Sequence, residues 1–233
     1  MIRKRRIKSK DKIKPNFCIL VPVYNEENTI ADMIKSLNES GYPYLIVNDG
    51  STDFTTVLVR SFSKWYIDYS KNKGKGFAIK TGAKEIINKG YDYVLIMDSD
   101  GQNSLKDLST FFTALKIHPN ARIIMGNRLH AHKSMPLLRL ITNWVMSVLI
   151  SFIVGQRIYD TQCGYRLVHK DVFKLRIKSN RFEMESEMLL KAGKKEYKII
   201  SVPIKCIYHK GRKSKIRPIK DAIRFLKMLR RLR

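Results

Sequence analysis

A hydrophobic run that ends abruptly at two carboxylates is the feature that most constrains this chain. Residues 91–97 are aromatic or aliphatic apart from Asp92, which predicts a strand buried in a sheet, and Asp98 and Asp100 follow directly. The two carboxylates lie two positions apart, so in an extended backbone their side chains project to the same side. The segment therefore delivers paired acid groups to the end of a buried strand.

The turn after this strand adds a third oxygen ligand. Gly101 permits a tight turn, and Gln102 then supplies an amide oxygen. Mg²⁺ and Mn²⁺ prefer such oxygen ligands and take the remaining ones from water and substrate phosphates. A lone Asp-x-Asp is equally typical of a strand end at which Asp caps the next helix, so the rest of the chain must decide.

Predicted strands and helices alternate along the chain. Hydrophobic runs at 17–23, 44–48 and 66–69 precede segments with helical periodicity, and a last strand is expected over 202–208. This alternation predicts an α/β fold with a doubly wound, mostly parallel sheet and helices on both faces, in which ligands bind at the carboxyl ends of the strands. The polar residues at those ends are Tyr24, Glu26, Asp49, Asp53, Asp98 and Asp100. Their coincidence favours a ligand site over helix capping.

Positive charge is concentrated at the two ends of the chain. The formal net charge is +26, and the cations gather in residues 3–14 and 205–233. Such a surface attracts phosphate in nucleic acid, in anionic lipid or in charged substrates. Charge alone therefore does not select the partner.

Cysteine usage and hydrophobicity indicate a cytosolic protein. Cys18, Cys163 and Cys206 are scattered, without the spacing of a zinc site or a disulfide framework. No apolar segment follows the basic N-terminus at signal-peptide distance, and the longest uncharged run, 140–156, is shorter than the roughly 20 residues that span a bilayer. We therefore expect no signal peptide and no transmembrane helix.

Several segments, taken in order, resemble one enzyme family. The segments 22–26, 49–53, 74–76 and 98–102 resemble the family 2 glycosyltransferases, whose GT-A fold binds a nucleotide-diphosphate sugar. The segments 126–128, 160–166 and 181–183, with the helix from Arg139, look like the branch that includes dolichyl-phosphate mannosyltransferase and bacterial polyprenyl-phosphate glycosyltransferases. The resemblance implies a basic tail over 1–15, a GT-A domain over 16–205, and a basic loop with an amphipathic helix over 206–233.

The resemblance also implies roles for individual residues. Asn48 stands where the family often has Asp, which removes a charge at that position. By resemblance, the nucleotide-sugar site comprises Pro22, Tyr24, Glu26, Asp49, Lys75 and Asp98, the metal site comprises Asp98, Asp100 and Gln102, and the catalytic set comprises Asp98, Asp100, Asp160 and Arg166. Asp160 would contact sugar hydroxyls or hold Arg166, and Arg166 would help to stabilise the leaving diphosphate.

A polar stripe on an apolar helix contains residues that are candidates for binding the acceptor. Arg139, Asn143, Ser147 and Ser151 are spaced by four, so they share one face of a predicted helix. Either a core helix turns this stripe to water, or the helix lies at a membrane interface. In the lipid-phosphate branch, arginines matching Arg128 and Arg139 bind the acceptor phosphate, and Asn143 falls one turn beyond.

The function implied by the resemblance is an inverting, metal-dependent transfer of a hexose. The donor would be a nucleotide-diphosphate sugar and the acceptor a polyprenyl phosphate at the cytoplasmic face of a membrane, with Mg²⁺ or Mn²⁺ as cofactor. The basic amphipathic pattern from Pro218 onward is typical of a segment bound to an anionic membrane surface. No nucleic acid partner is expected.

Three alternatives remain at this point. The acceptor could be a hydroxyl of a cell-wall or surface glycan, for which Glu183, Glu185 or Glu187 would serve as general base. A basic nucleic-acid-binding protein is the alternative from another class, although no recognised nucleic-acid module appears. A nucleotidyltransferase on a similar fold ranks lower, because the residues after Arg128 match lipid-phosphate transfer better.

Overall fold

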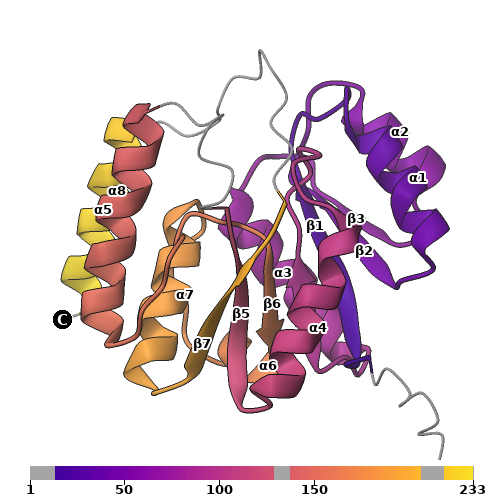
Figure 1. The fold of residues 1–233 in the computed structure, drawn as a ribbon. Coiled ribbons are helices and arrows are strands. Elements are labelled where there is room, and N and C mark those ends of the chain that lie inside the picture. The colour runs from indigo at the N-terminus through magenta and orange to yellow at the C-terminus, as the bar shows by residue number, and fades with distance from the viewer. Residues whose placement is uncertain (1–13, 129–136, 206–217, 233) are drawn as a thin grey trace, which may run out of the picture.

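A computed structural model of the protein describes residues 14–128, 137–205 and 218–232 (Figure 1). Within them, seven strands form one sheet in the order β3-β2-β1-β4-β6-β5-β7. The strands are β1 (Phe17–Val23), β2 (Tyr44–Asn48), β3 (Tyr66–Asp68), β4 (Tyr93–Ile96), β5 (Ala121–Asn127), β6 (Arg166–His169) and β7 (Lys198–Pro203). The helices are α1 (Ile30–Ser40), α2 (Thr55–Phe62), α3 (Lys75–Asn88), α4 (Leu108–Ile117), α5 (Leu137–Val154), α6 (Lys170–Phe173), α7 (Glu183–Lys194) and α8 (Pro218–Leu232), with a short 3₁₀ helix at Leu105–Asp107.

The sheet carries apolar side chains on both faces, as a doubly wound fold requires. Strand β1 is buried throughout, and its successive residues enter two different cores. Gly82 of α3 lies so close to Leu20 that a Cβ there would overlap the leucine side chain. Helices α3, α6 and α7 cover this face, whereas α1, α2 and α4 pack with Ile19 and Val21 on the other. The predicted fold class is confirmed.

Strand β6 runs against its neighbours. It lies antiparallel between β4 and β5, while the other described strand pairs are parallel. Because of this reversal, its first residue, Arg166, lies at the edge where the parallel strands end, opposite Ile96 and Met125. The residues that precede β6 therefore join the loops that follow β1, β2, β4 and β5.

The pairing of β1 with β4 ends at this same edge of the sheet. Their pairing ends at Leu20 and Ile96, with β2 and β3 on one side of them and β5 and β7 on the other. In open α/β sheets, ligands bind where the chain leaves two neighbouring parallel strands toward opposite sides of the sheet. Asp98 follows β4 by two residues and lies at this point.

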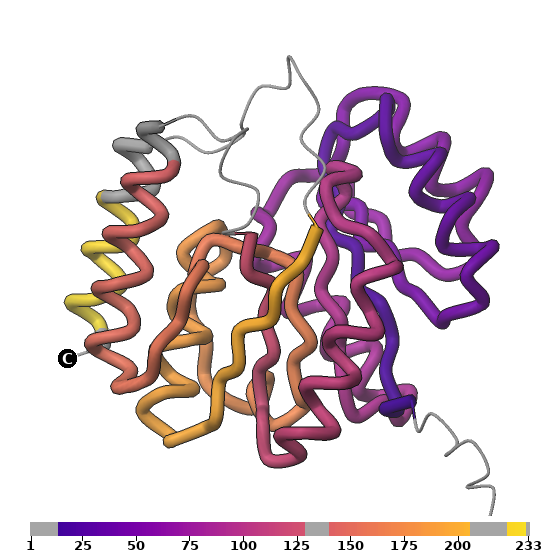
Figure 2. The backbone as a smooth tube through the Cα atoms, in the orientation of Figure 1, coloured from indigo at the N-terminus to yellow at the C-terminus, as the bar shows by residue number. Residues whose placement is uncertain are grey.

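Helices α5 and α8 form an outer layer. Both pack on α7, so they lie beyond the helix that covers the sheet, and Figure 2 shows the same arrangement along the backbone. Ile150 of α5 and Phe225 and Met228 of α8 are buried. At the contact between α5 and α7, a Cβ on Gly193 would meet the side chain of Val154 at 2.7 Å.

Some expectations fall partly outside the described residues. Strand β7 begins at Lys198, earlier than the predicted strand over 202–208, and residues 206–208 are not described. The tail up to residue 13 and the basic loop over 206–217 also lie outside the description, so the domain limits stay a prediction. Among the helices that are described, none is long and apolar enough to cross a bilayer.

Candidate active site

Asp98 lies at the centre of the site. Its Oδ1 is 2.6 Å from Nζ of Lys75, and Gly164 lies so close that a Cβ there would overlap the carboxylate. Burial alone would raise the pKa of Asp98, but the charge and hydrogen bond of Lys75, aided by Arg128 and Arg166, hold that pKa below its ordinary value. The carboxylate is therefore fixed in place and ionised.

Lys75 joins Asp98 to a second carboxylate. It is the first residue of α3, and its Nζ also lies 3.2 Å from Oε1 of Glu185 in α7. Burial lowers the pKa of Lys75, but the charges of Asp98 and Glu185 raise it above its ordinary value, so the ammonium stays protonated. Glu185 lies 110 positions from Lys75, and no local pattern in the sequence reveals the pair.

The loop before Lys75 is held by Asp49. The Asp49 carboxylate accepts hydrogen bonds from the backbone N–H groups of Lys73 (2.9 Å) and Gly74 (2.7 Å). On the other side of the loop, Phe77 donates its N–H to the carbonyl of Asn180 at 2.9 Å. The Asp49 side chain thus shapes the loop, and its predicted contact with a nucleotide base stays a prediction.

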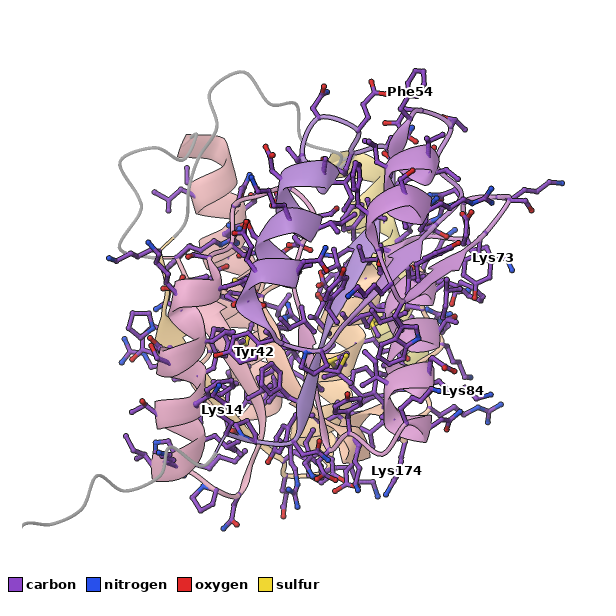
Figure 3. The ribbon with its side chains drawn as sticks, turned by 90° about the vertical axis from the view of Figure 1, so that its right-hand side faces the viewer. Lys14, Tyr42, Phe54, Lys73, Lys84 and Lys174 are labelled. Atoms are coloured by element: carbon purple, nitrogen blue, oxygen red, sulfur yellow. The ribbon has the colours of Figure 1, made fainter. Side chains whose placement is uncertain are left out.

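Gly74 and Lys73 complete this loop. Gly74 has φ +106°, a backbone conformation that residues with a side chain rarely adopt, and a Cβ there would overlap Asn180. The Lys73 ammonium lies 4.5 and 4.8 Å from the ring centres of Tyr69 and Phe77, at the surface of the protein (Figure 3). Lys73 is therefore engaged by aromatic rings, and Lys75 is the cation that the loop presents to the site.

Asp100 and Gln102 form the turn after Asp98. Oδ1 of Asp100 accepts a hydrogen bond from the Gln102 N–H at 3.0 Å. Burial and the charge of Asp98 raise the pKa of Asp100, and this hydrogen bond only partly offsets them. The two carboxylates therefore repel each other, and a cation between them would relieve that repulsion.

These residues fit a divalent ion. Among the described residues no group of three or more His, Cys, Asp or Glu side chains gathers as a metal centre. An ion here would instead take Asp98, Asp100 and Gln102 and complete its shell with water and phosphate oxygens, as Mg²⁺ usually does. Their function as metal ligands stays a prediction.

The loop after β1 reaches the same edge. Pro22 lies in β1 and Tyr24 directly after it, and Glu26 is nearly buried. Oε2 of Glu26 accepts a hydrogen bond from the Thr29 hydroxyl (3.1 Å), which also lies 3.0 Å from the Ser99 carbonyl. The predicted nucleoside loop is thus tied to the loop that carries Asp98.

The departure from the family at Asn48 has a structural reason. Nδ2 of Asn48 donates hydrogen bonds to Thr56 (2.8 Å) and to Oδ1 of Asp68 (2.9 Å), and its Oδ1 accepts one from the Ser51 hydroxyl. An aspartate here would place its carboxylate against that of Asp68. The amide therefore braces the Asp-Gly-Ser loop without a charge.

Asp160 binds Arg128. Nε and Nη2 of Arg128 lie 2.7 and 2.9 Å from the two carboxylate oxygens, and both residues are buried. The sequence predicted that Asp160 contacts sugar hydroxyls or holds Arg166. The structure pairs it with a different arginine, the one predicted to bind the acceptor phosphate.

Arg166 is fully buried. Its guanidinium donates to the backbone carbonyls of Thr161 (2.8 Å), Cys163 (2.7 Å) and Glu185 (3.0 Å). It thereby ties the loop before β6 to α7, a bracing role that sequence reasoning missed. Direct contact between Arg166 and the donor diphosphate stays a prediction.

The three acidic residues at the start of α7 have different partners. Glu187 accepts hydrogen bonds from the N–H groups of Lys178 (3.0 Å) and Ser179 (2.8 Å) and pairs with Lys191. Glu183 has one buried carboxylate oxygen, Oε2, without a hydrogen-bond partner. Glu185 is the member of the three that pairs with Lys75, whose ammonium also contacts Asp98.

A groove of about 710 Å³ runs along α5 beside Arg128 and Asp160. Its walls are mainly apolar and include Leu140, Trp144 and Ile158. Its polar lining residues are Arg128, Asn143, Ser147, Ser151, Arg157 and Asp160. The structure thus brings Asn143 and Arg128 to one groove, as predicted for the acceptor. Arg139 lies in α5, but its side chain is outside the described part of the chain.

Comparisons with known proteins identify the family. The model of glycosyl transferase family 2 matches residues 18–176. The UDP-N-acetylglucosamine–dolichyl-phosphate N-acetylglucosaminyltransferase of Methanococcus voltae is 28% identical over 82% of this chain and 85% of its own. The dolichyl-phosphate beta-glucosyltransferase of Dictyostelium discoideum is 28% identical over 92% of this chain and 73% of its own.

A solved structure shares the fold. Glucosyl-3-phosphoglycerate synthase of Mycobacterium tuberculosis, crystallised with Mn²⁺, UDP and phosphoglyceric acid, superposes with a TM-score of 0.71. It is 14% identical, and the match covers 94% of this chain and 78% of that protein, so it shows the GT-A fold alone. From the family match and these relatives, the chain belongs to glycosyl transferase family 2 and is a glycosyltransferase.

Proposed function

We propose that the protein transfers a hexose from a nucleotide-diphosphate sugar to the phosphate of a polyprenyl lipid, with inversion and with Mg²⁺ or Mn²⁺ as cofactor. The observation that carries this proposal is the groove along α5, which has largely apolar walls and whose charged lining residues are Arg128, Arg157 and Asp160. A hydrocarbon chain with a terminal phosphate matches apolar walls that carry two arginines and one carboxylate. The names of the dolichyl-phosphate relatives support the same acceptor class.

The donor would lie over the loops that follow β1, β2 and β4. Pro22, Tyr24, Glu26 and Asp49 would contact the nucleoside. A divalent ion held by Asp98, Asp100 and Gln102 would supply positive charge where the diphosphate leaves. Lys75 adds a second cation beside Asp98.

The acceptor phosphate would bind Arg128, with Arg139 and Asn143 on α5. These groups aim a phosphate oxygen at the anomeric carbon, so positioning contributes most of the rate. Asp160 fixes the plane of the Arg128 guanidinium. A phosphate is already ionised, so this reaction requires no general base.

Helix α5 supports a position at the cytoplasmic face of an anionic membrane. Ser151 faces inward and bonds the backbone of Ile158, while Trp144 and Phe152 are 65% and 85% exposed. A helix that turns Ser147 and Ser151 inward and exposes large apolar side chains is suited to an apolar environment. Helix α8 likewise exposes Leu226.

Cations on α8 would strengthen this attachment. Lys227 and Arg230 are exposed on the same helix. Each cation near an anionic surface contributes about 1 kcal/mol. We therefore include the anionic membrane surface among the partners of the protein.

A transfer assay tests the proposal. Purified protein is incubated with polyprenyl phosphate, Mg²⁺ or Mn²⁺, and a panel of labelled nucleotide sugars, and label is counted in the organic phase. We expect metal-dependent label for one donor, lost in Asp100→Asn and retained in Asp92→Asn. Asp92 is a matched control because it pairs with Lys170 at the protein surface.

Other outcomes select other functions. Nucleotide release with the label left in water would mean that the sugar passes to water and not to the lipid phosphate. This outcome would favour a hydroxyl acceptor such as a glycan, and a loss of that release in Glu185→Gln would strengthen this alternative. Binding of nucleic acid without any use of nucleotide sugars would overturn the proposal.

A further inference from the structure

The ammonium of Lys75 lies between two carboxylates that belong to different parts of the site. Its Nζ is 2.6 Å from Oδ1 of Asp98, at the end of β4, and 3.2 Å from Oε1 of Glu185, in α7. Asp98 is a proposed metal ligand, whereas Glu185 has no assigned role in transfer. One cation thus connects the proposed metal site to a carboxylate outside it.

The backbones around Lys75 are fixed. The preceding loop is held by Asp49 on one side and by Asn180 on the other. A Cβ on Gly76 would meet Cβ of Met184 at 2.5 Å, so the first turn of α3 also lies directly against α7. Movement of the Lys75 ammonium between its partners therefore requires rotation of its side chain alone.

Asp98 and Glu185 are also held in place. Gly164 lies directly against the Asp98 carboxylate, and the backbone carbonyl of Glu185 accepts a hydrogen bond from Arg166 at 3.0 Å. Both carboxylates therefore stay within reach of the same ammonium.

Charged groups from several elements surround Lys75. The described charged groups that interact there are the carboxylates Asp98, Asp100, Asp160 and Glu185 and the cations Lys75, Arg128 and Arg166. Arg128 is bound by Asp160, and Arg166 by backbone carbonyls. Among the cations that the structure describes, Lys75 is therefore the one placed to compete with a divalent ion for Asp98.

We propose that Glu185 is a positioning residue that sets the divalent-ion affinity of the site by holding Lys75 when the ion takes Asp98. Without the ion, Lys75 screens Asp98. With the ion bound, Glu185 keeps the ammonium beside the donor diphosphate. The inference rests on the proposed metal-dependent transfer and adds to it an exchange of one cation between two carboxylates.

A double-mutant cycle tests the exchange. Mn²⁺ binding to the full-length protein is measured by electron paramagnetic resonance of the free ion, with and without UDP, at a salt concentration that screens long-range fields. In Glu185→Gln, Lys75 keeps Asp98 as its partner and competes more strongly, so we expect Mn²⁺ binding to weaken about fivefold. In Lys75→Gln the competitor is gone, so Mn²⁺ binding tightens.

The decisive comparison is made in the Lys75→Gln background. If Glu185 acts through Lys75, adding Glu185→Gln there changes Mn²⁺ affinity by less than about twofold. The same fivefold loss in both backgrounds would show that Glu185 acts by its charge alone and would overturn the inference. Glu183→Gln, which removes the same charge two positions earlier and on another side of α7, should leave Mn²⁺ affinity unchanged.

A second variant covers the case in which Lys75→Gln does not fold. Lys75→Arg retains the charge, and its planar guanidinium can bind both carboxylates at once. It should therefore hold Asp98 more firmly and weaken Mn²⁺ binding. An unchanged Mn²⁺ affinity in this variant would contradict the exchange.

The transfer assay separates failure of this inference from failure of the proposed function. Sugar transfer that depends on Mn²⁺, together with no coupling between Lys75 and Glu185, would overturn the exchange alone. A wild-type protein that neither binds Mn²⁺ nor transfers sugar would overturn both.

Discussion

Arg128 and Asp160 form a two-point ion pair, with Nε 2.7 Å from Oδ2 and Nη2 2.9 Å from Oδ1. Arg128 is 6% exposed and Asp160 is 4% exposed. The carboxylate thereby fixes the plane and direction of the guanidinium beside the groove along α5. The pair is both a buried structural contact and the proposed anchor for the acceptor phosphate.

Replacing Asp160 by Asn should weaken both roles. The substitution leaves the buried Arg128 charge without its counterion, and we expect the free energy of unfolding to fall by about 3 kcal/mol. Because Arg128 then loses its fixed direction, KM for polyprenyl phosphate should rise more than KM for the nucleotide sugar. Denaturant unfolding and steady-state kinetics measure the two effects. Equal rises in both KM values would contradict the assigned position of Arg128.

Replacing Gly164 by Ala should disturb Asp98 directly. The new Cβ would overlap the Asp98 carboxylate, and overpacking of this kind typically costs about 1–3 kcal/mol of stability. We expect the displaced carboxylate to bind Mn²⁺ about tenfold more weakly, measured by titration of the free ion.

Gly193→Ala is the matched control for this change. Its Cβ would crowd Val154 at the contact between α5 and α7, away from the carboxylates. It should lower stability and leave Mn²⁺ binding unchanged. If both variants weaken Mn²⁺ binding equally, the effect would come from general loosening of the fold.

Glu187 should make stability depend on pH. Burial raises the pKa of Glu187, but hydrogen bonds from Ser179, Lys178 and Lys191 outweigh it and lower the pKa from 4.5 to about 2. A carboxyl with a depressed pKa in the folded state stabilises the protein above its unfolded pKa, and this contribution is lost as pH falls from 4.5 to about 2.

The Glu187→Gln variant measures this contribution. It should be less stable than the wild type by about 3 kcal/mol at neutral pH, because the charge that binds two N–H groups and Lys191 is gone. The difference should shrink below pH 4.5, as chemical unfolding at a series of pH values would show. A constant difference between pH 7 and pH 3 would contradict the assignment.

Exposed apolar residues on α5 should govern membrane attachment. Phe152→Glu removes an 85% exposed aromatic ring from the proposed membrane-facing surface and adds a charge that anionic lipid repels. We expect sedimentation with phosphatidylglycerol vesicles to fall about tenfold in affinity. Phe54→Glu is the matched control, because Phe54 is 71% exposed beside α2 (Figure 3). Equal losses in the two variants would contradict the assignment of this surface.

The strand-end residues were the predictable part of the site. Strands β1, β2 and β4 are uniformly hydrophobic runs, so their limits and the polar residues after them follow from the sequence. The resemblance added Arg128 and Arg166, which lie at the same edge of the sheet. What it could not supply was the partner of each side chain.

The pairs that shape the site join distant parts of the chain. Lys75 and Glu185 are 110 positions apart, and Arg128 and Asp160 are 32 positions apart. Such contacts depend on the order of the strands, and above all on the insertion of β6 between β4 and β5, which hydrophobic periodicity does not encode. The stripe on α5 was visible in the sequence, but the Ser151 hydroxyl forms hydrogen bonds with the backbone of Ile158, in the loop before β6, and does not face water.

The position of β6 leaves two strand edges unpaired during synthesis. β6 pairs with β4 on one side and β5 on the other, and both are made before it during synthesis. Until residues 166–169 are added, the unpaired N–H and C=O groups of two hydrophobic strand edges are exposed to other chains. The same four residues carry Arg166, which ties the loop before β6 to α7. Inserting β6 and placing Arg166 are therefore one event, and a nascent chain that stops short of β6 has neither.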